Sequence, residues 1–161
     1  MASTTFSGPV TSTNGFIGNI TGNLTGNVTG NVTGNIAGSG TITHATTAAI
    51  NATATATAAE VATGYITSTS AAATAITLPT GTLLGAAIGA VRGTVFDLYV
   101  DNTAGASVVT MAVAVNGILS SGAADTPGSF GDLTIAAGAT GIARFTLMFA
   151  SATAYVFTRT A

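Results

Sequence analysis

The stretch GIARFTLMFASATAYVFTRT, residues 141–160, decides the fold class of this chain. In its first half every second residue is large and apolar, the set being Phe145, Leu147 and Phe149. Successive side chains of a β-strand point to opposite faces, so this period of two indicates a strand with one buried face. A turn near Ser151 separates it from a second alternating segment, ATAYVFTRT. The stretch therefore predicts two successive strands.

The same pattern recurs in the sequence before this stretch. TVFDLYVD (94–101) places apolar side chains on one face and Asp97, Tyr99 and Asp101 on the other. SVVTMAVAV (107–115) alternates again and ends at Asn116-Gly117, a strong turn signal. Further strands are predicted in GYITSTS (64–70), TAITLP (74–79) and GDLTIAA (131–137). About seven short strands over roughly 100 residues predict an all-β domain, a β-sandwich or jelly roll, over residues 63–161.

Residues 18–40, GNITGNLTGNVTGNVTGNIAGSG, repeat one tetrad with glycine at every fourth position. A helix is excluded, because each glycine would cost about 1 kcal/mol relative to alanine. In an extended chain the apolar residues share one face with the glycines, and asparagine and threonine take the other. A lone strand of this kind buries nothing, whereas parallel copies around an axis would bury the apolar ridge. We expect an extended arm or stalk that is shared between identical chains.

Two other regions flank the repeat. Residues 1–17 form an irregular lead, and residues 41–62, TITHATTAAINATATATAAEVA, form a low-complexity connector. The connector alternates with period two, but alanine is a poor strand former and a good helix former. Its structure stays open at this stage.

The charge content excludes several classes of function. Charged residues make up 5% of the chain, against about 25% in typical soluble domains, and the formal net charge is −2. With three cationic residues, nucleic-acid binding is not expected, since affinity for phosphates comes from neutralising cations. The longest apolar stretch, LLGAAIGAV (83–91), is well short of the roughly 20 residues of a membrane span. Such a weakly charged surface suits a protein packed within a large assembly.

No catalytic, metal or cofactor site is expected. The only histidine, His44, and the only glutamate, Glu60, lie in the connector, whereas general acid–base catalysis needs paired groups in a pocket. The four aspartates could supply oxygen ligands, but no loop has the ligand density of a calcium motif. They are interpreted as solvent-facing or turn residues: Asp97, Asp101, Asp125 and Asp132.

The lead TFSGPVTSTNGF (5–16), the tetrads, and the segments TAITLPTG and GIARFTLMFASATAYVFTRT together resemble structural proteins of tailed bacteriophages. The similarity is to capsid decoration and head-fibre proteins. It implies a homotrimer on the virion's capsid surface, bound to the major capsid protein, with the β domain projecting as a knob. Under this resemblance the capsid-anchoring residues are the apolar ones of the lead: Phe6, Pro9, Val10, Phe16 and Ile17. The trimer-axis residues are the apolar positions of the repeat: Ile20, Leu24, Val28, Val32 and Ile36.

Two arrangements of the arm are open. Arms that lie across neighbouring capsomers would cement the shell, and upright arms would let the knobs reach a host surface or a polysaccharide. The alternative function is a tail-fibre tip or receptor-binding adhesin, which would show a carbohydrate-sized groove with exposed aromatic side chains. The residues to examine for that function are Tyr65, Tyr99 and Tyr155.

Overall fold

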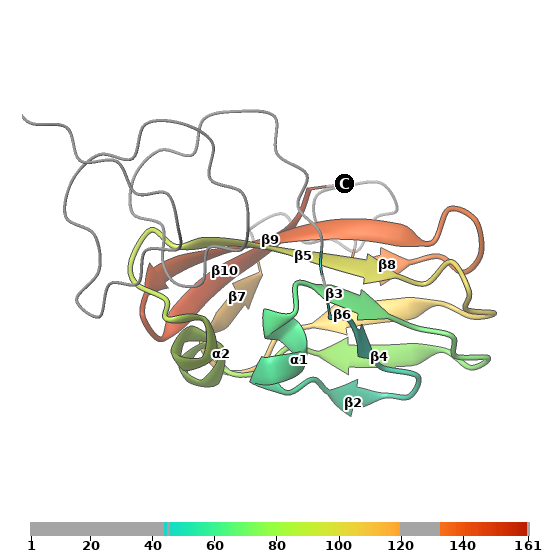
Figure 1. Cartoon of the computed structure of the whole chain (residues 1–161), viewed down its shortest axis with the longest axis horizontal. Helices are drawn as coiled ribbons and strands as arrows, with labels where there is room; N and C mark the ends of the chain where they lie inside the picture. The colour runs from blue at the N-terminus through green and yellow to red at the C-terminus, as the bar shows by residue number, and fades with distance from the viewer. Residues whose placement is uncertain (1–43, 45, 120–132, 161) are drawn as a thin grey trace, which may run out of the picture. The chain divides into compact units, whose positions relative to one another are not determined.

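The computed structural model describes residue 44 and residues 46–119 and 133–160, all within one compact unit of the chain, residues 41–161. These residues form two β-sheets, here named sheet A and sheet B, and two helices (Figure 1). Sheet A consists of β1 (Ala48–Ala49), β3 (Tyr65–Thr67), β5 (Val95–Asp101), β7 (Gly117–Leu119), β9 (Ile142–Ser151) and β10 (Ala154–Arg159). Sheet B consists of β2 (Ala54–Thr55), β4 (Thr74–Thr77), β6 (Val109–Ala112) and β8 (Thr134–Ile135).

The prediction of a mostly β region is confirmed. Each of the seven segments predicted as strands contains one, and the turn at Asn116 is present, with a φ of 65°. The strand predicted over 107–115 is shorter than expected, because β6 ends at Ala112 and the side chain of Val115 is 72% exposed. The strands β1, β2 and β7 are additional to the prediction.

The strand pairing differs from that of a jelly roll, whose strands are antiparallel. The sheet orders are β1-β3-β5-β9-β10-β7 and β2-β4-β6-β8. Within them β1, β3 and β5 run parallel, as do β2, β4 and β6. Consecutive strands from β1 to β9 lie alternately in sheet A and sheet B. Between the parallel neighbours β1 and β3, for example, the chain passes through β2 of the other sheet. Period-two alternation carries no information on pairing direction, which is why the sequence could not predict this.

Antiparallel pairing joins the last two strands of sheet A to this parallel part. β9 pairs with β5 on one side and with β10 on the other. The register places Leu98 opposite Phe145 and Leu147 opposite Phe157, so that apolar side chains align on the inner face. The rings of Phe145 and Phe157 stack with centroids 4.8 Å apart.

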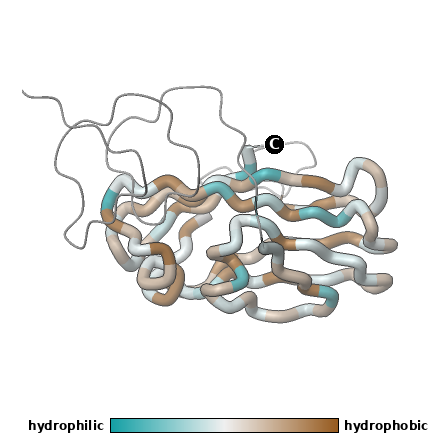
Figure 2. The backbone as a smooth tube through the Cα atoms, in the orientation of Figure 1, coloured by the Kyte–Doolittle hydropathy of each residue, from teal (hydrophilic) through white to brown (hydrophobic). Residues whose placement is uncertain are grey.

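One hydrophobic core lies between the sheets. Sheet A supplies Leu98, Phe145 and Leu147 and sheet B supplies Ile76 and Met111, each at most 1% exposed. Strongly hydrophilic positions are scattered thinly along the described backbone, and apolar positions recur along every long strand (Figure 2). The expected buried face of residues 141–160 is therefore confirmed.

The connector, whose structure the sequence left open, belongs to this fold. It supplies β1, β2 and the helix α1 (Ala58–Ala62), and its residues Ala48, Ile50 and Ala56 are buried in the core. Thr57 caps α1: its hydroxyl accepts a hydrogen bond from the Glu60 amide, and the Glu60 carboxylate accepts one from the Thr57 amide. Glu60 therefore has a structural role in a capping box.

The sequence did not predict α2 (Gly81–Ile88). Thr80 caps its first turn, and Gly89 ends it in the left-handed conformation, with a φ of 64°. The helix packs closely on the turn between β9 and β10, where a Cβ atom at Gly85 would overlap the carbonyl oxygen of Ala152. Glycine, which weakens a helix in isolation, is required here by the close approach of backbone.

Candidate functional site

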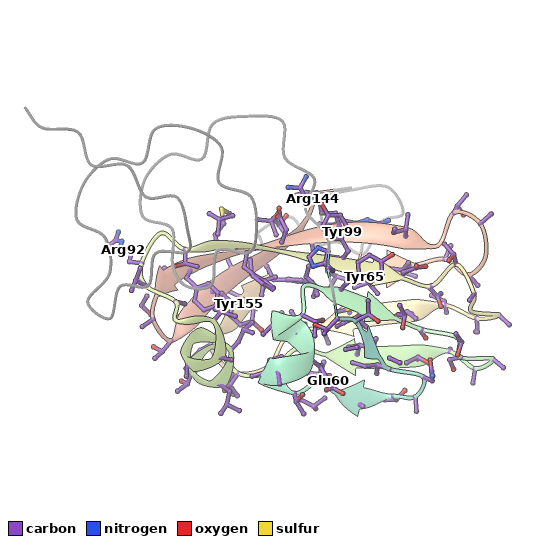
Figure 3. All side chains as sticks on the ribbon, in the orientation of Figure 1. Glu60, Tyr65, Arg92, Tyr99, Arg144 and Tyr155 are labelled. Carbon is purple, nitrogen blue, oxygen red and sulfur yellow. The ribbon has the colours of Figure 1, made fainter. Side chains whose placement is uncertain are left out.

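The outer face of sheet A, which points away from the core, carries two tyrosines, two aspartates and an arginine: Tyr65, Tyr99, Asp97, Asp101 and Arg144. Strand register places Tyr65 of β3 beside Tyr99 of β5, and Tyr99 beside Arg144 of β9. These three side chains lie close together on the same side of the sheet (Figure 3). Three residues that are far apart in the sequence thus form one row across three neighbouring strands.

Three aromatic rings form a cluster on this face. The rings of Tyr65 and Tyr99 are nearly parallel, 20° apart, with centroids separated by 6.3 Å. His44 lies 5.8 Å from Tyr65 and 5.6 Å from Tyr99, tilted against both. The Arg144 guanidinium carbon lies 6.0 Å from the centroid of Tyr99, within the distance of a cation–π contact.

The position of His44 depends on the backbone of the segment that ends α1. Its Nδ1 lies 2.9 Å from the carbonyl oxygen of Thr63, which can only accept, so Nδ1 is the donor of this hydrogen bond. Gly64 has a φ of 73°, and a Cβ there would meet the imidazole at 2.5 Å. The glycine leaves the space that the histidine ring occupies.

Asp97 and Arg144 form an ion pair of 2.6 Å between Oδ2 and Nη2. The Thr146 hydroxyl donates to the other carboxylate oxygen of Asp97 at 2.7 Å. Burial acts to raise the pKa of Asp97, but the hydrogen bonds from Arg144 and Thr146 and the positive charge of Arg144 outweigh it and lower the pKa. Asp97 is therefore ionised over the whole neutral range.

Asp101 is held by a second network on the same face. Its Oδ1 accepts hydrogen bonds from the hydroxyl and the amide of Thr103, and these lower its pKa. Its Oδ2 accepts from the Tyr65 hydroxyl at 2.9 Å. The pKa of Tyr65 is raised, first by burial and then by this bond to a carboxylate. Tyr65 therefore stays a neutral donor.

A hollow of about 620 Å³ adjoins the aromatic cluster. Its described lining is mainly aromatic and apolar, with one carboxylate: His44, Tyr65, Val95, Phe96, Asp97, Tyr99 and Ile142. The volume lies within the range of small-molecule sites, about 300–1,000 Å³. No lysine or arginine is among these lining residues.

An apolar row crosses the same outer face beside this hollow. Register aligns Val95, Met148, Val156 and Ile118 across the adjacent strands β5, β9, β10 and β7. Val95 is 63% exposed, Met148 45% and Ile118 57%. We name these four residues the outer apolar row; Val95 also lines the hollow, so the two features share a border.

The structure tests few of the predicted site residues. The predicted capsid-anchoring residues (Phe6, Pro9, Val10, Phe16 and Ile17) and trimer-axis residues (Ile20, Leu24, Val28, Val32 and Ile36) lie outside the described residues, as do Asp125 and Asp132. Asp97 and Asp101 lie on the outer face as expected. Among the described residues, no group of three or more metal-ligating side chains comes together.

Of the three tyrosines named for a receptor-binding role, two lie next to each other on the outer face of sheet A and the third is buried in the core. Tyr65 and Tyr99 are half-buried neighbours on the outer face, whereas Tyr155 is 0% exposed and donates a hydrogen bond to the Pro79 carbonyl from inside the core. Burial raises the pKa of Tyr155 to about 12. Tyr155, which the sequence named only as a residue to examine, is not available to a ligand, because the alternation of β10 places it with Phe157 on the inner face.

Sequence reasoning also missed two members of the cluster. The sequence shows His44 as an isolated residue of the connector, and it does not show which aspartate pairs with Arg144. The alternation of each strand gives the side on which a residue lies, but which strands are neighbours depends on the sheet order. No local signal in the sequence brings residues 44, 65, 99 and 144 together.

None of the helices in the described part of the chain reaches the length and apolarity needed to cross a membrane. Comparisons with protein-family models, with curated proteins and with solved structures find no match to this chain.

Proposed function

We propose that this chain is a structural protein of a tailed-bacteriophage virion, a homotrimeric capsid decoration or head-fibre protein that binds the major capsid protein through its N-terminal segment. The observation that carries the proposal is the tetrad repeat of residues 18–40, an uncharged apolar ridge with glycine at regular gaps. Such a segment becomes ordered only against identical neighbours, so folding and assembly are coupled. The role is mechanical and involves no catalysis.

The β domain supports this proposal through its surface. The outer apolar row exposes three large apolar side chains side by side, on a chain in which charged residues are only 5%. Apolar surface of this kind is normally covered in an assembly. The partner we propose for it is another copy of this chain, because an arm shared by three chains would hold three such domains at high local concentration. Under this proposal the knob is the two-sheet domain, which includes the described part of the connector as well as the strands that follow it.

The first experiment tests the shared arm. In the full chain, replacing Val28 and Val32 together by aspartate should abolish the trimer, because the charges would enter the proposed axial ridge. The matched control places the same charges on the polar face, with Thr29→Asp and Thr33→Asp, and should leave the trimer intact. Sedimentation velocity measures both. Trimers of unchanged stability in the Val28/Val32 variant would rule out the axial role.

The second experiment tests the anchor and the location. A chain lacking residues 1–17 should remain soluble and trimeric but no longer bind capsids in a pull-down. Electron cryo-microscopy of the virion that carries this chain would then locate it. Symmetric density on the shell supports a decoration or head-fibre role, and density confined to the tail would replace it with the alternative, a tail-fibre tip.

That alternative, a receptor-binding adhesin, is favoured by one observation on the described residues. The aromatic cluster and the hollow beside it form a concave surface with few charges on the outer face of sheet A. A capsid cement protein has no evident need for such a surface.

A further inference from the structure

We propose that the hollow beside His44, Tyr65 and Tyr99 is a binding site for a neutral saccharide. The proposal goes beyond the structural role above and does not depend on whether the chain sits on the head or the tail. It rests on three properties of the hollow: aromatic walls, polar atoms that can take a further hydrogen bond, and no lysine or arginine in the described lining.

The walls match the apolar side of a sugar ring. A pyranose has a face of C–H groups that packs on aromatic and aliphatic surface, and its hydroxyl groups project from the edges. Tyr65, Tyr99 and His44 supply aromatic surface, and Val95 and Ile142 supply aliphatic surface at 63% and 48% exposure. The two tyrosine rings are held by adjacent strands and by each other, so little side-chain entropy is lost when a ligand binds.

The polar groups match the hydroxyl edge of a sugar. An ionised carboxylate offers about four acceptor positions, and Asp97 uses one on each oxygen for Arg144 and Thr146. The Tyr99 hydroxyl and Nε2 of His44 have no hydrogen-bond partner among the described residues. Asp97, Tyr99 and His44 can therefore accept or exchange hydrogen bonds with ligand hydroxyls without breaking a contact that already exists.

Charge decides between neutral and anionic ligands. Among the described residues that line the hollow, Asp97 carries the carboxylate, and its lowered pKa keeps it negative at neutral pH. The Arg144 side chain near it is already engaged with that carboxylate at 2.6 Å. A sialic acid, a uronic acid or a phosphorylated sugar would place a second negative charge beside Asp97, while Arg144 is already paired with that carboxylate. The site therefore favours neutral saccharides.

The test uses the full chain on an array of neutral oligosaccharides of glucose, galactose, mannose, rhamnose and N-acetylglucosamine, with sialylated and uronic-acid oligosaccharides on the same array. Any neutral oligosaccharide retained is then titrated into the protein, with tyrosine emission as the second readout. The chain has no tryptophan and three tyrosines, of which Tyr155 is buried, so a ligand on Tyr65 and Tyr99 changes the emission directly.

Variants assign the binding to the hollow. Tyr99→Ala should weaken binding by roughly tenfold or more, as expected when a buried ring contact is removed. Tyr99→Phe keeps the ring and loses only the hydroxyl, so it should weaken binding by a smaller factor. Thr110→Ala, on the outward side of sheet B, should bind as the parent chain does. Thermal melting of each variant shows that the domain is folded.

Three outcomes would overturn the proposal. The first is retention of no neutral oligosaccharide. The second is retention that Tyr99→Ala does not weaken. The third is preferential retention of the anionic oligosaccharides, which would contradict the charge argument. A chain that forms no trimer but binds a neutral saccharide at Tyr99 would separate this site from the proposed assembly role.

Discussion

At the scale of single residues, buried Asn102 shows how one side chain joins distant parts of the fold. It is 0% exposed, and its amide nitrogen donates to the carbonyl oxygens of Ser107, Ile135 and Ala136. Its backbone carbonyl accepts from Gly105 and Gly138. The residue follows directly after β5 and therefore ties the end of a sheet A strand to β8 of sheet B.

We expect Asn102→Ala to lower the free energy of unfolding by about 1–3 kcal/mol, because buried carbonyl groups lose their donor. Asn102→Asp should destabilise in a pH-dependent way. The new carboxyl group would face three carbonyl oxygens, which raises its pKa in the folded state. The folded state is therefore stabilised at low pH, where the carboxyl is protonated, and the free energy of unfolding falls as the pH rises through the folded-state pKa. Urea unfolding at pH 4 and pH 8 measures both effects. Equal stability of Asn102→Asp at the two pH values would contradict the assignment.

Tyr155 gives a second prediction at this scale. Its folded-state pKa of about 12 exceeds the ordinary value of 10.0, so the folded state keeps a proton that the unfolded state loses. The proton on Tyr155 stabilises the folded state fully below pH 10, and this stabilisation is lost as the pH rises toward 12. At about 1.4 kcal/mol per pH unit, the free energy of unfolding should fall by roughly 2–3 kcal/mol over this range. Urea unfolding between pH 9 and pH 12 should show this fall in the parent chain. Tyr155→Phe should be less stable at pH 8, because it lacks the hydrogen bond to the Pro79 carbonyl. Its free energy of unfolding should fall less steeply with pH than that of the parent chain.

At the scale of elements, α2 shows tertiary contact overriding helix propensity. Glycine in a helix interior costs about 1 kcal/mol relative to alanine, so Gly85→Ala would stabilise an isolated helix. In this fold the added Cβ would overlap the Ala152 carbonyl oxygen at the turn between β9 and β10. The element is therefore placed by packing against a distant turn.

We expect Gly85→Ala to destabilise the domain by at least 1 kcal/mol, although alanine has the higher helix propensity. Ala86 provides the matched control, because it is exposed on the same helix. Ala86→Gly should destabilise by about 1 kcal/mol through propensity alone. Thermal melting compares the two. A Gly85→Ala variant more stable than the parent chain would show that α2 does not approach the turn as described.

At the scale of the whole molecule, the outer apolar row connects the β domain with the proposed assembly. Met148→Glu together with Ile118→Glu should weaken association between copies, because charges would be buried in the contact. The unfolding free energy of the domain should change little, since both side chains are about half exposed or more. Thr158→Glu, next to the row on β10, is the control. Sedimentation equilibrium measures the association, and an unchanged constant in the double variant would exclude the row from the interface.

Local pattern in the sequence determined the β character of this chain, the seven segments that contain strands and the inward or outward side of most of their residues. These features follow from the period of two and from turn residues such as Asn116-Gly117, which act within a few residues. Only the tertiary structure decided the parallel pairing, the assignment of residues 46–62 to the same core and the helix at Gly81–Ile88. It also decided that His44, Tyr65, Tyr99 and Arg144 meet on one face while Tyr155 is buried. Each of these depends on which strands lie side by side, and that is set by packing between segments far apart in the chain.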